Sequence, residues 1–173
     1  FEGGIAHRLD TLTGGFVVVA KSVEALAVIR AEWGELSKFY RFYSTAKVDF
    51  RELVVTVPIA HHPRKKDRVV VGVHRRHRGE WRPAWTRLRR LGEGWWEAEI
   101  RTGVLHQVRA HAAFAGVPLD GDEIYGGKPV SDEVAGLGAE GVLTGLPKRG
   151  ATLVHVGIVG KDWSFWLPDP PGP

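Results

Sequence analysis

The chain has 173 residues, of which 43% are hydrophobic, and it carries a formal net charge of +4 with seven Trp and seven Phe. This length suits one domain with a sizeable core, and the aromatic content argues against a disordered chain. The absence of Cys excludes disulfides and thiolate metal sites, and no apolar run reaches the roughly 18 residues that a membrane helix needs.

The first predicted elements are a strand and a helix. Phe16–Ala20 is a β-branched run typical of a buried strand. Ser22 then predicts the N-cap of a helix from Val23 to Trp33, with an apolar face that includes Val28. Further strands are predicted at Phe39–Tyr43, Leu53–Ile59, Val69–Val73, Trp85–Leu91, Trp95–Arg101, Leu153–Val159 and Trp163–Leu167.

A hairpin and a second helix complete the predicted set. Gly92-Glu93-Gly94 predicts a tight turn between the two strands beside it. Leu105–Ala115 has helical periodicity, and Gly116 follows as its C-terminal stop. Because neighbouring strands are often joined by hairpins, we expect an α+β fold, a mainly antiparallel mixed β-sheet flanked by a few helices and loops. The proline-rich residues 168–173 cannot form a β-ladder and predict a mobile tail.

The positive charge is concentrated in one part of the chain. Residues 61–90 contain eleven Lys or Arg and two acidic residues, whereas the remainder contains 13 basic and 18 acidic residues. A basic stripe of this kind favours binding to a phosphate backbone. A solvated basic loop is the competing interpretation, and for a single charge run it is the more common one.

One acidic segment and one helical segment contain the candidate chemistry. Asp10 lies in His7-Arg8-Leu9-Asp10-Thr11-Leu12-Thr13-Gly14-Gly15, directly before the first predicted strand. An Asp before Thr and Gly is by itself typical of a turn or cap. The second segment, Leu105-His106-Gln107-Val108-Arg109-Ala110-His111, places an arginine on the second predicted helix.

Both segments resemble RluA-type pseudouridine synthases. The Asp10 segment resembles the active-site segment of that family, and Thr102 to His111 is similar to its Thr-Gly-Arg-Thr-His-Gln-Ile-Arg-Val-His motif. Three shorter segments follow the family in the same order, namely Lys38-Phe39-Tyr40, Gly116 to Gly127 and Ala151 to Val156. The resemblance therefore extends from Ile5 to about Leu167 and implies the pseudouridine synthase catalytic fold.

The resemblance implies roles for individual residues. Asp10 would be the essential catalytic residue, Arg109 would pair with it and keep it ionised, and Tyr40 would line the site and stack on uracil. Arg8, His106 and Gln107 are expected at the substrate. The resemblance further implies that Asp122 and Tyr125 brace a loop and that His111 is structural.

The implied activity is the isomerisation of a specific uridine in ribosomal or transfer RNA. Such an isomerase needs no cofactor, and RNA is the expected partner. We expect a cytoplasmic monomer with no membrane attachment. The pairs His61-His62 and His74 with His77 lie among cations, which repel a metal ion, so no metal site is expected.

Two departures from the family pattern have consequences. Gly103-Val104-Leu105-His106 stands where the family usually has Gly-Arg-Thr-His, so a cation and a hydroxyl are replaced by apolar groups. The family's lysine–proline–glycine strand ahead of the aspartate is absent, and the chain starts at Phe1 without any Met. We therefore expect residues 1–167 to be a single catalytic domain that lacks its N-terminal strand.

Two other functions are compatible with these residues. A non-catalytic RNA-binding domain that retained the fold is the main alternative, and Val104 and Leu105 motivate it. A hydrolase that cleaves a glycosidic bond is the weaker one. It would need a second carboxylate, from Asp120 or Asp122, to face Asp10.

Overall fold

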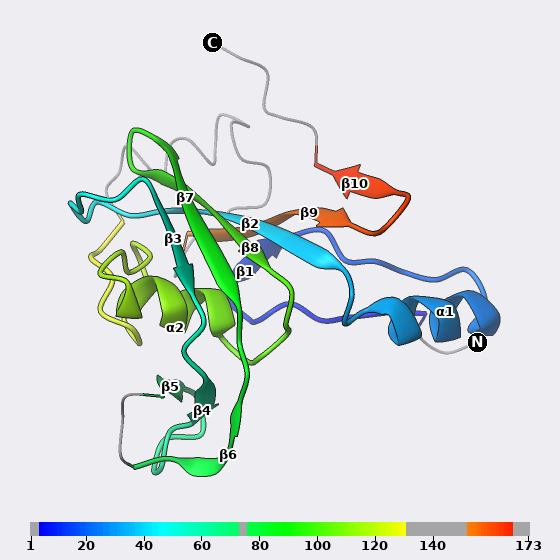
Figure 1. Ribbon diagram of the computed structural model, residues 1–173, viewed down its shortest axis with the longest axis horizontal. Helices are drawn as coiled ribbons and strands as arrows, with labels where there is room; N and C mark the ends of the chain where they lie inside the picture. The colour runs from blue at the N-terminus through cyan, green and yellow to red at the C-terminus, as the bar shows by residue number, and fades with distance from the viewer. Residues whose placement is uncertain (1–3, 73–75, 131–151, 168–173) are drawn as a thin grey trace.

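The computed structural model describes residues 4–72, 76–130 and 152–167. In these residues a seven-stranded sheet, a three-stranded sheet and two α-helices form an α+β fold (Figure 1). The helices are α1 (Val23–Glu32) and α2 (Gln107–Phe114). The strands are β1 (Thr13–Gly15), β2 (Ser37–Tyr43), β3 (Glu52–Val55), β4 (Ile59–His61), β5 (Val69–Val71), β6 (Arg78–Arg82), β7 (Thr86–Gly92), β8 (Trp95–Ile100), β9 (Leu153–Val159) and β10 (Ser164–Trp166). The proline-rich residues 168–173, predicted to be a mobile tail, lie outside the described residues.

The large sheet has the strand order β1-β9-β2-β8-β7-β3, and β10 also pairs with β9. Only the pairing of β1 with β9 is parallel among the described strands. The mainly antiparallel mixed sheet is therefore confirmed. The predicted hairpin is also confirmed, since β7 and β8 pair across a turn in which Glu93 has a φ of 47°.

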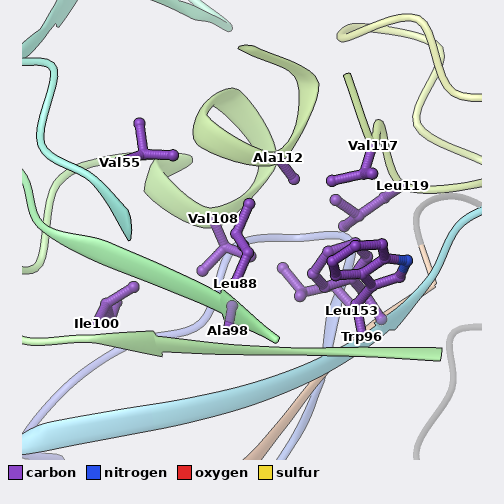
Figure 2. Close-up of a cluster of buried hydrophobic side chains, with 11 residues drawn as sticks. Val55, Leu88, Trp96, Ala98, Ile100, Val108, Ala112, Val117, Leu119 and Leu153 are labelled. Carbon is purple, nitrogen blue, oxygen red and sulfur yellow. The ribbon is translucent and has the colours of Figure 1, made fainter. Parts of the chain in front are cut away.

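Helix α2 lies between the two sheets and contributes to both hydrophobic cores (Figure 1). On the side of the large sheet, Val108 and Ala112 pack with Leu88, Trp96 and Ala98 (Figure 2). On the opposite side, Ala110 packs with a second cluster from the small sheet and its flank, formed by Ile59, Val69, Val71 and Ala84. As a result every residue of α2 from Gln107 to Ala112 is buried. The polar side chains of this helix are therefore held in place by their surroundings.

The start of the chain differs from the prediction. The strand β1 is Thr13–Gly15, and Val17 and Val19, expected in a buried strand, are exposed. Gly15 is the last residue of β1 that pairs with β9, and β10 pairs with the next part of the same strand, from Gly157 to Val159. Because β2 occupies the other side of β9, β1 cannot continue along it, and the β-branched run leaves the sheet.

Helix α1 begins and ends as predicted but does not bury an apolar face. The Ser22 hydroxyl accepts a hydrogen bond from the backbone N–H of Ala25 at 3.1 Å, which confirms the N-cap. No residue of α1 is buried among the described residues, and Val28 is 56% exposed. The helical pattern was therefore correct, but the tertiary partner that it implied is not part of the described structure.

The middle of the chain contains two strands more than predicted. Leu53–Ile59 is divided between β3 in the large sheet and β4 in the small sheet, since the chain crosses from one sheet to the other. Strand β6, which the sequence did not predict, pairs with β4. Its sequence, Arg-Gly-Glu-Trp-Arg, is almost entirely polar and exposed, so it lacks the alternation by which strands are recognised. No helix among the described residues is long and apolar enough to cross a membrane.

Candidate active site

A cleft of about 460 Å³ opens between the segment before β1, strand β2 and the start of α2. It is lined by all six residues predicted at the site, Arg8, Asp10, Tyr40, His106, Gln107 and Arg109. These residues come from three segments that are far apart in the sequence. The fold therefore brings the predicted residues to one concave surface, which is the usual form of a small-molecule or base-binding site.

Asp10 is held at the mouth of this cleft by a turn. Its carbonyl accepts a hydrogen bond from the N–H of Thr13 at 2.9 Å, at the start of β1. Its side chain is 27% exposed, and its Oδ2 atom lies 3.9 Å from Nε2 of His106. Asp10 is the only carboxylate among the described residues that line the cleft. It is thus rigidly attached and accessible to a ligand.

The ion-pair partner of Arg109 differs from the one that was expected. Its Nε and one terminal nitrogen donate to the two carboxylate oxygens of Asp122 at 2.6 and 2.8 Å, and both side chains are almost fully buried. The predicted direct pair with Asp10 is therefore not formed. Burial opposes the charge of Arg109, but the hydrogen bonds and charge of Asp122 outweigh it and raise the pKa of Arg109. Asp10 also raises this pKa, so Arg109 still acts on it through space.

The reason for this correction lies in the loop after α2. Backbone hydrogen bonds from Asp122 to Leu119 and from Gly127 to Asp122 fold the loop back and place the carboxylate against the helix. Asp122 therefore has the bracing role that was predicted. The sequence did not reveal that Arg109 is its partner, because two acidic residues compete for one arginine and only the folded loop decides between them.

His106 connects the cleft to the same loop. Its Nδ1 lies 3.0 Å from the Tyr125 hydroxyl, which accepts a hydrogen bond from the N–H of Val69 at 2.9 Å. The tyrosine proton is then available for Nδ1, which leaves the His106 proton on Nε2, facing Asp10. Burial, followed by the charge of Arg109, lowers the pKa of His106, so the ring is neutral at neutral pH. His106 is strained, with a φ of 54°, which is unusual for a residue with a side chain.

Tyr40 is positioned by the centre of the large sheet. Its ring stacks on His155, with 4.7 Å between the ring centroids. The register between β2 and β9 shifts between Phe39 and Tyr40 because Val156 is an extra residue in β9, while the pairing of β2 with β8 continues without a shift. Burial, and then the charge of Asp10, raises the pKa of Tyr40, so the phenol keeps its proton. At neutral pH it can donate a hydrogen bond to a ligand in the cleft.

Gln107 differs from its predicted role at the substrate. Its carbonyl oxygen accepts from Thr102 and Val104 at 2.9 and 3.1 Å, and its amide nitrogen donates to Trp85 and Thr86 at 2.9 and 3.1 Å. The protein thus already occupies both ends of this amide. Gln107 positions the loop between β8 and α2, although part of it reaches the cleft surface.

Arg8 and His111 occupy very different environments. Arg8 is exposed at the edge of the cleft, where a charged ligand can reach it. His111 is fully buried, with Nδ1 2.9 Å from the Thr86 hydroxyl and Nε2 2.8 Å from the Val57 carbonyl. These contacts confirm the structural role predicted for His111.

Sequence reasoning missed Lys38 and Trp33, which also line the cleft. Lys38 is buried, and its Nζ donates to the carbonyls of Trp33 and Arg101 at 3.2 Å each. Burial lowers the pKa of Lys38 to about 8. Lys38 could have been predicted from the sequence. Residues two apart on a strand face the same side, and Tyr40 was already predicted at the site.

The acidic residues of the loop after α2 lie elsewhere. Asp120 accepts hydrogen bonds from the backbone and the hydroxyl of Thr45 at 3.2 and 3.3 Å, and Asp122 is bound to Arg109. Neither residue lines the cleft. The second carboxylate that a glycoside hydrolase would need is therefore not supplied by the two residues considered for it.

Similarity to known proteins agrees with this arrangement. The family model described as RNA pseudouridylate synthase matches residues 1–114. The chain is 36% identical over 137 residues to ribosomal large subunit pseudouridine synthase D of Salmonella typhimurium, covering 74% of this chain and 39% of that protein. It is 33% identical over 126 residues to an RNA pseudouridine synthase of Synechocystis sp., covering 70% of this chain and 38% of that protein. The chain thus spans about two fifths of the length of these relatives.

Solved structures of two human proteins share this fold. Human RNA Pseudouridylate Synthase Domain Containing 1 superposes with a TM-score of 0.75 over 97% of this chain and 69% of its own, at 21% identity. Human RNA Pseudouridylate Synthase Domain Containing 4 has a TM-score of 0.70 at 20% identity, over 98% of this chain and 72% of its own. The match to the family model includes both the Asp10 segment and helix α2. The chain therefore belongs to the RluA-type family of RNA pseudouridine synthases.

Proposed function

We propose that residues 1–167 form the catalytic domain of an enzyme that isomerises a uridine within RNA to pseudouridine, with Asp10 as the catalytic residue. The observation that carries this proposal is the convergence of Asp10, Tyr40 and Arg109 on one cleft that contains no other carboxylate from the described residues. The cleft is open to solvent near the exposed Arg8, so a nucleotide that has left its stack can enter it.

The reaction requires one bond to move on the uracil ring. The bond between N1 and C1′ breaks, a bond between C5 and C1′ forms, C5 loses a proton and N1 gains one. In our proposal the Asp10 carboxylate acts on the ribose or the base as nucleophile or proton acceptor. The protonated Tyr40 lies against the uracil and donates a hydrogen bond. Since atoms and electrons balance within the nucleotide, no redox or phosphoryl cofactor is required.

Arg109 and His106 act through their charge and their hydrogen bonds. Arg109 is held by Asp122 and provides a fixed positive charge in the wall of the cleft. The neutral ring of His106 places Nε2 3.9 Å from the Asp10 carboxylate, and we propose that this contact limits where the carboxylate can lie. We assign both residues to positioning Asp10. Arg8, at the edge of the cleft, is proposed to contact the RNA backbone.

Ribosomal RNA of the large subunit is the first substrate to test. Relatives that bear the name ribosomal large subunit pseudouridine synthase D, from Salmonella typhimurium and Escherichia coli, are 36% and 35% identical to this chain. Transfer RNA is the second substrate class, and we propose a cytoplasmic enzyme. The basic residues 61–90 would hold the RNA backbone near the cleft.

The decisive experiment compares the full-length protein with its Asp10→Asn variant. Total RNA from a strain that lacks the gene is incubated with each protein, and pseudouridine is mapped by carbodiimide labelling and primer extension. We expect one or a few new sites with the wild type and a rate at least about 10³-fold lower with Asp10→Asn. Asp49→Asn is the matched control, because Asp49 is exposed and does not line the cleft. Near-normal turnover by Asp10→Asn would refute the assignment.

One observation favours a second function. Val104 and Leu105 line the cleft and make part of its wall apolar, where the family usually has an arginine and a threonine. A non-catalytic RNA-binding domain would tolerate this change. It predicts RNA binding that weakens with salt, is unaffected by Asp10→Asn, and is accompanied by no new pseudouridine.

A further inference from the structure

A second cavity, of about 450 Å³, adjoins the Asp10 cleft. Four residues line both cavities, namely Trp33, Lys38, Gly103 and Val104. On its far side the second cavity is lined by Glu80, Trp81 and Arg82, which belong to β6, and by Arg101, which follows β8. The residues from β6 and Arg101 belong neither to the family motifs nor to the proposed mechanism. Because the two cavities share a wall, a nucleotide next to one bound in the Asp10 cleft can reach the second cavity.

Two tryptophans give this cavity surfaces on which a base can stack. Trp81 is half-buried, and its ring centroid lies 4.4 Å from that of His77. Trp33 stacks on His7 with 4.5 Å between the ring centroids. Each indole ring is thus supported on one side by an imidazole while it lines the cavity. Aromatic rings of this kind bind unpaired bases of any sequence, because every base has an aromatic face.

Cations surround the same cavity. The guanidinium of Arg101 lies 4.4 Å from the ring centroid of Trp85, which holds it in place, and Arg82 is exposed on β6. Lys38 lies in the shared wall and uses two of its N–H groups on the carbonyls of Trp33 and Arg101. An ammonium has three such donors, so one is left for a ligand. A phosphate that links one nucleotide to the next would meet positive charge on both sides of this wall.

The carboxylate of Glu80 indicates which part of a nucleotide fits into the second cavity. A carboxylate repels a phosphate but accepts hydrogen bonds from the exocyclic amino groups of adenine, cytosine and guanine. Uracil has no such group. The base, rather than the phosphate, therefore fits beside Glu80, with the phosphates nearer to the cations.

We propose that this second cavity binds the base of an unpaired nucleotide adjacent to the target uridine, with Trp81 as the stacking surface and Glu80 as the acceptor for an amino group. This inference rests on the proposed function, because it takes the Asp10 cleft as the site of the uridine. It adds a sequence preference next to the modified position. A base with an exocyclic amino group is favoured there over uracil.

The test measures binding of fluorescein-labelled RNA to the full-length protein. The probes are an unpaired octamer with one uridine flanked by adenosines, an octamer of uridines and an RNA duplex. Trp81→Leu is expected to weaken binding to the adenosine-containing octamer about 10-fold and to leave duplex binding unchanged. Trp163→Leu is the matched control, since Trp163 is 44% exposed and lines neither cavity. Glu80→Ala is expected to abolish the preference for the adenosine-containing octamer over the uridine octamer.

Other outcomes overturn the proposal without involving the function of the Asp10 cleft. Equal affinities of wild type and Trp81→Leu, with turnover still dependent on Asp10, would eliminate the second cavity alone. Equal weakening by Trp81→Leu and Trp163→Leu would show that no specific stacking occurs. If Trp81→Leu does not fold, Arg82→Gln takes its place. It should weaken binding to the octamer more than Arg51→Gln, an exposed arginine outside residues 61–90 that lines neither cavity. Because these experiments measure RNA affinity, they test the second cavity even if no pseudouridine is formed.

Discussion

At the scale of single residues, the buried charges of the site are held by partners that the fold supplies. Arg109 and Asp122 are 2% and 0% exposed and share two hydrogen bonds. A buried charge without its partner is strongly destabilising, since the interior solvates it poorly. The same pair keeps the positive charge of Arg109 in a constant position beneath the cleft.

Asp122→Asn is therefore expected to lower the free energy of unfolding by about 3–5 kcal/mol, because it leaves the Arg109 guanidinium uncompensated. Urea denaturation followed by tryptophan fluorescence measures this change. Asp67→Asn serves as the control, since the ion pair of Asp67 with Arg68 is exposed and is expected to leave the midpoint unchanged. A loss of less than about 1 kcal/mol in Asp122→Asn would contradict the importance of the pair.

The stack behind Tyr40 predicts a dependence of stability on pH. His155 is fully buried, and burial lowers its pKa from 6.5 to about 4. Between these values the unfolded chain binds a proton that the native protein does not bind, so the free energy of unfolding falls as the pH is lowered. The contribution of His155 to this loss is up to about 3 kcal/mol.

His155→Asn removes this titration, and its amide can still donate to the Phe16 carbonyl that His155 contacts at 3.1 Å. We expect the stability of this variant to vary less with pH than that of the wild type. Urea denaturation at several pH values from about 7 to about 4.5 tests this. His61→Asn, at an exposed position, should follow the wild type. Parallel curves for wild type and His155→Asn would contradict the prediction.

At the scale of elements, the short strand β1 decides where Asp10 lies. The turn from Asp10 to Thr13 leads directly into β1, and the pairing of β1 with β9 fixes its position against the large sheet. Gly15 has a φ of +108°, and a Cβ at this position would fall on the carbonyl group of His155. Only glycine permits this close approach of the two strands.

Gly15→Ala is accordingly expected to lower the free energy of unfolding by about 2 kcal/mol or more. It should also reduce pseudouridine formation more than about 10-fold under conditions where the variant is folded, since the Asp10 turn moves with β1. Gly34→Ala is a matched control for the unfolding measurement, because its φ is not in the left-handed region and nothing lies within 4 Å of the added Cβ. If Gly15→Ala unfolded like Gly34→Ala and matched the wild type in primer extension, β1 would not position Asp10.

At the scale of the whole molecule, the charge distribution predicts how RNA binding responds to salt. Lys65, Lys66 and Arg78 are exposed on the three-stranded sheet and its connections, within the basic residues 61–90. Cations that neutralise phosphates release counterions, so affinity for single-stranded RNA falls with salt by a slope of about 0.7 for each phosphate.

A triple change of Lys65, Lys66 and Arg78 to Gln should therefore reduce the slope of the logarithm of affinity against the logarithm of salt concentration by up to about 2. Lys21, Lys47 and Lys161 are also exposed but lie outside residues 61–90, so the same change there preserves the slope. Fluorescence anisotropy with an unpaired RNA at several salt concentrations measures both. Equal slopes for the two triple variants would show that the basic stretch is only a solvated loop.

The sequence by itself predicted most of the local elements and the residues that the fold brings to the cleft. Ser22, the β7–β8 hairpin turn and Gly116 act through backbone conformation over a few residues, so their effects can be predicted locally. The Asp10 and Arg109 segments could be assigned because the resemblance depends on residue order.

Only the tertiary structure decided which partner each of these residues has. Arg109 pairs with Asp122 because the loop after α2 folds back on the helix. Both ends of the Gln107 amide are engaged by Trp85 and Thr86 and by two residues of the β8–α2 loop. Strand β1 ends at Gly15 because β10 occupies the next part of β9. These outcomes depend on competition between groups that are distant in the chain, and local sequence patterns contain no information about such competition.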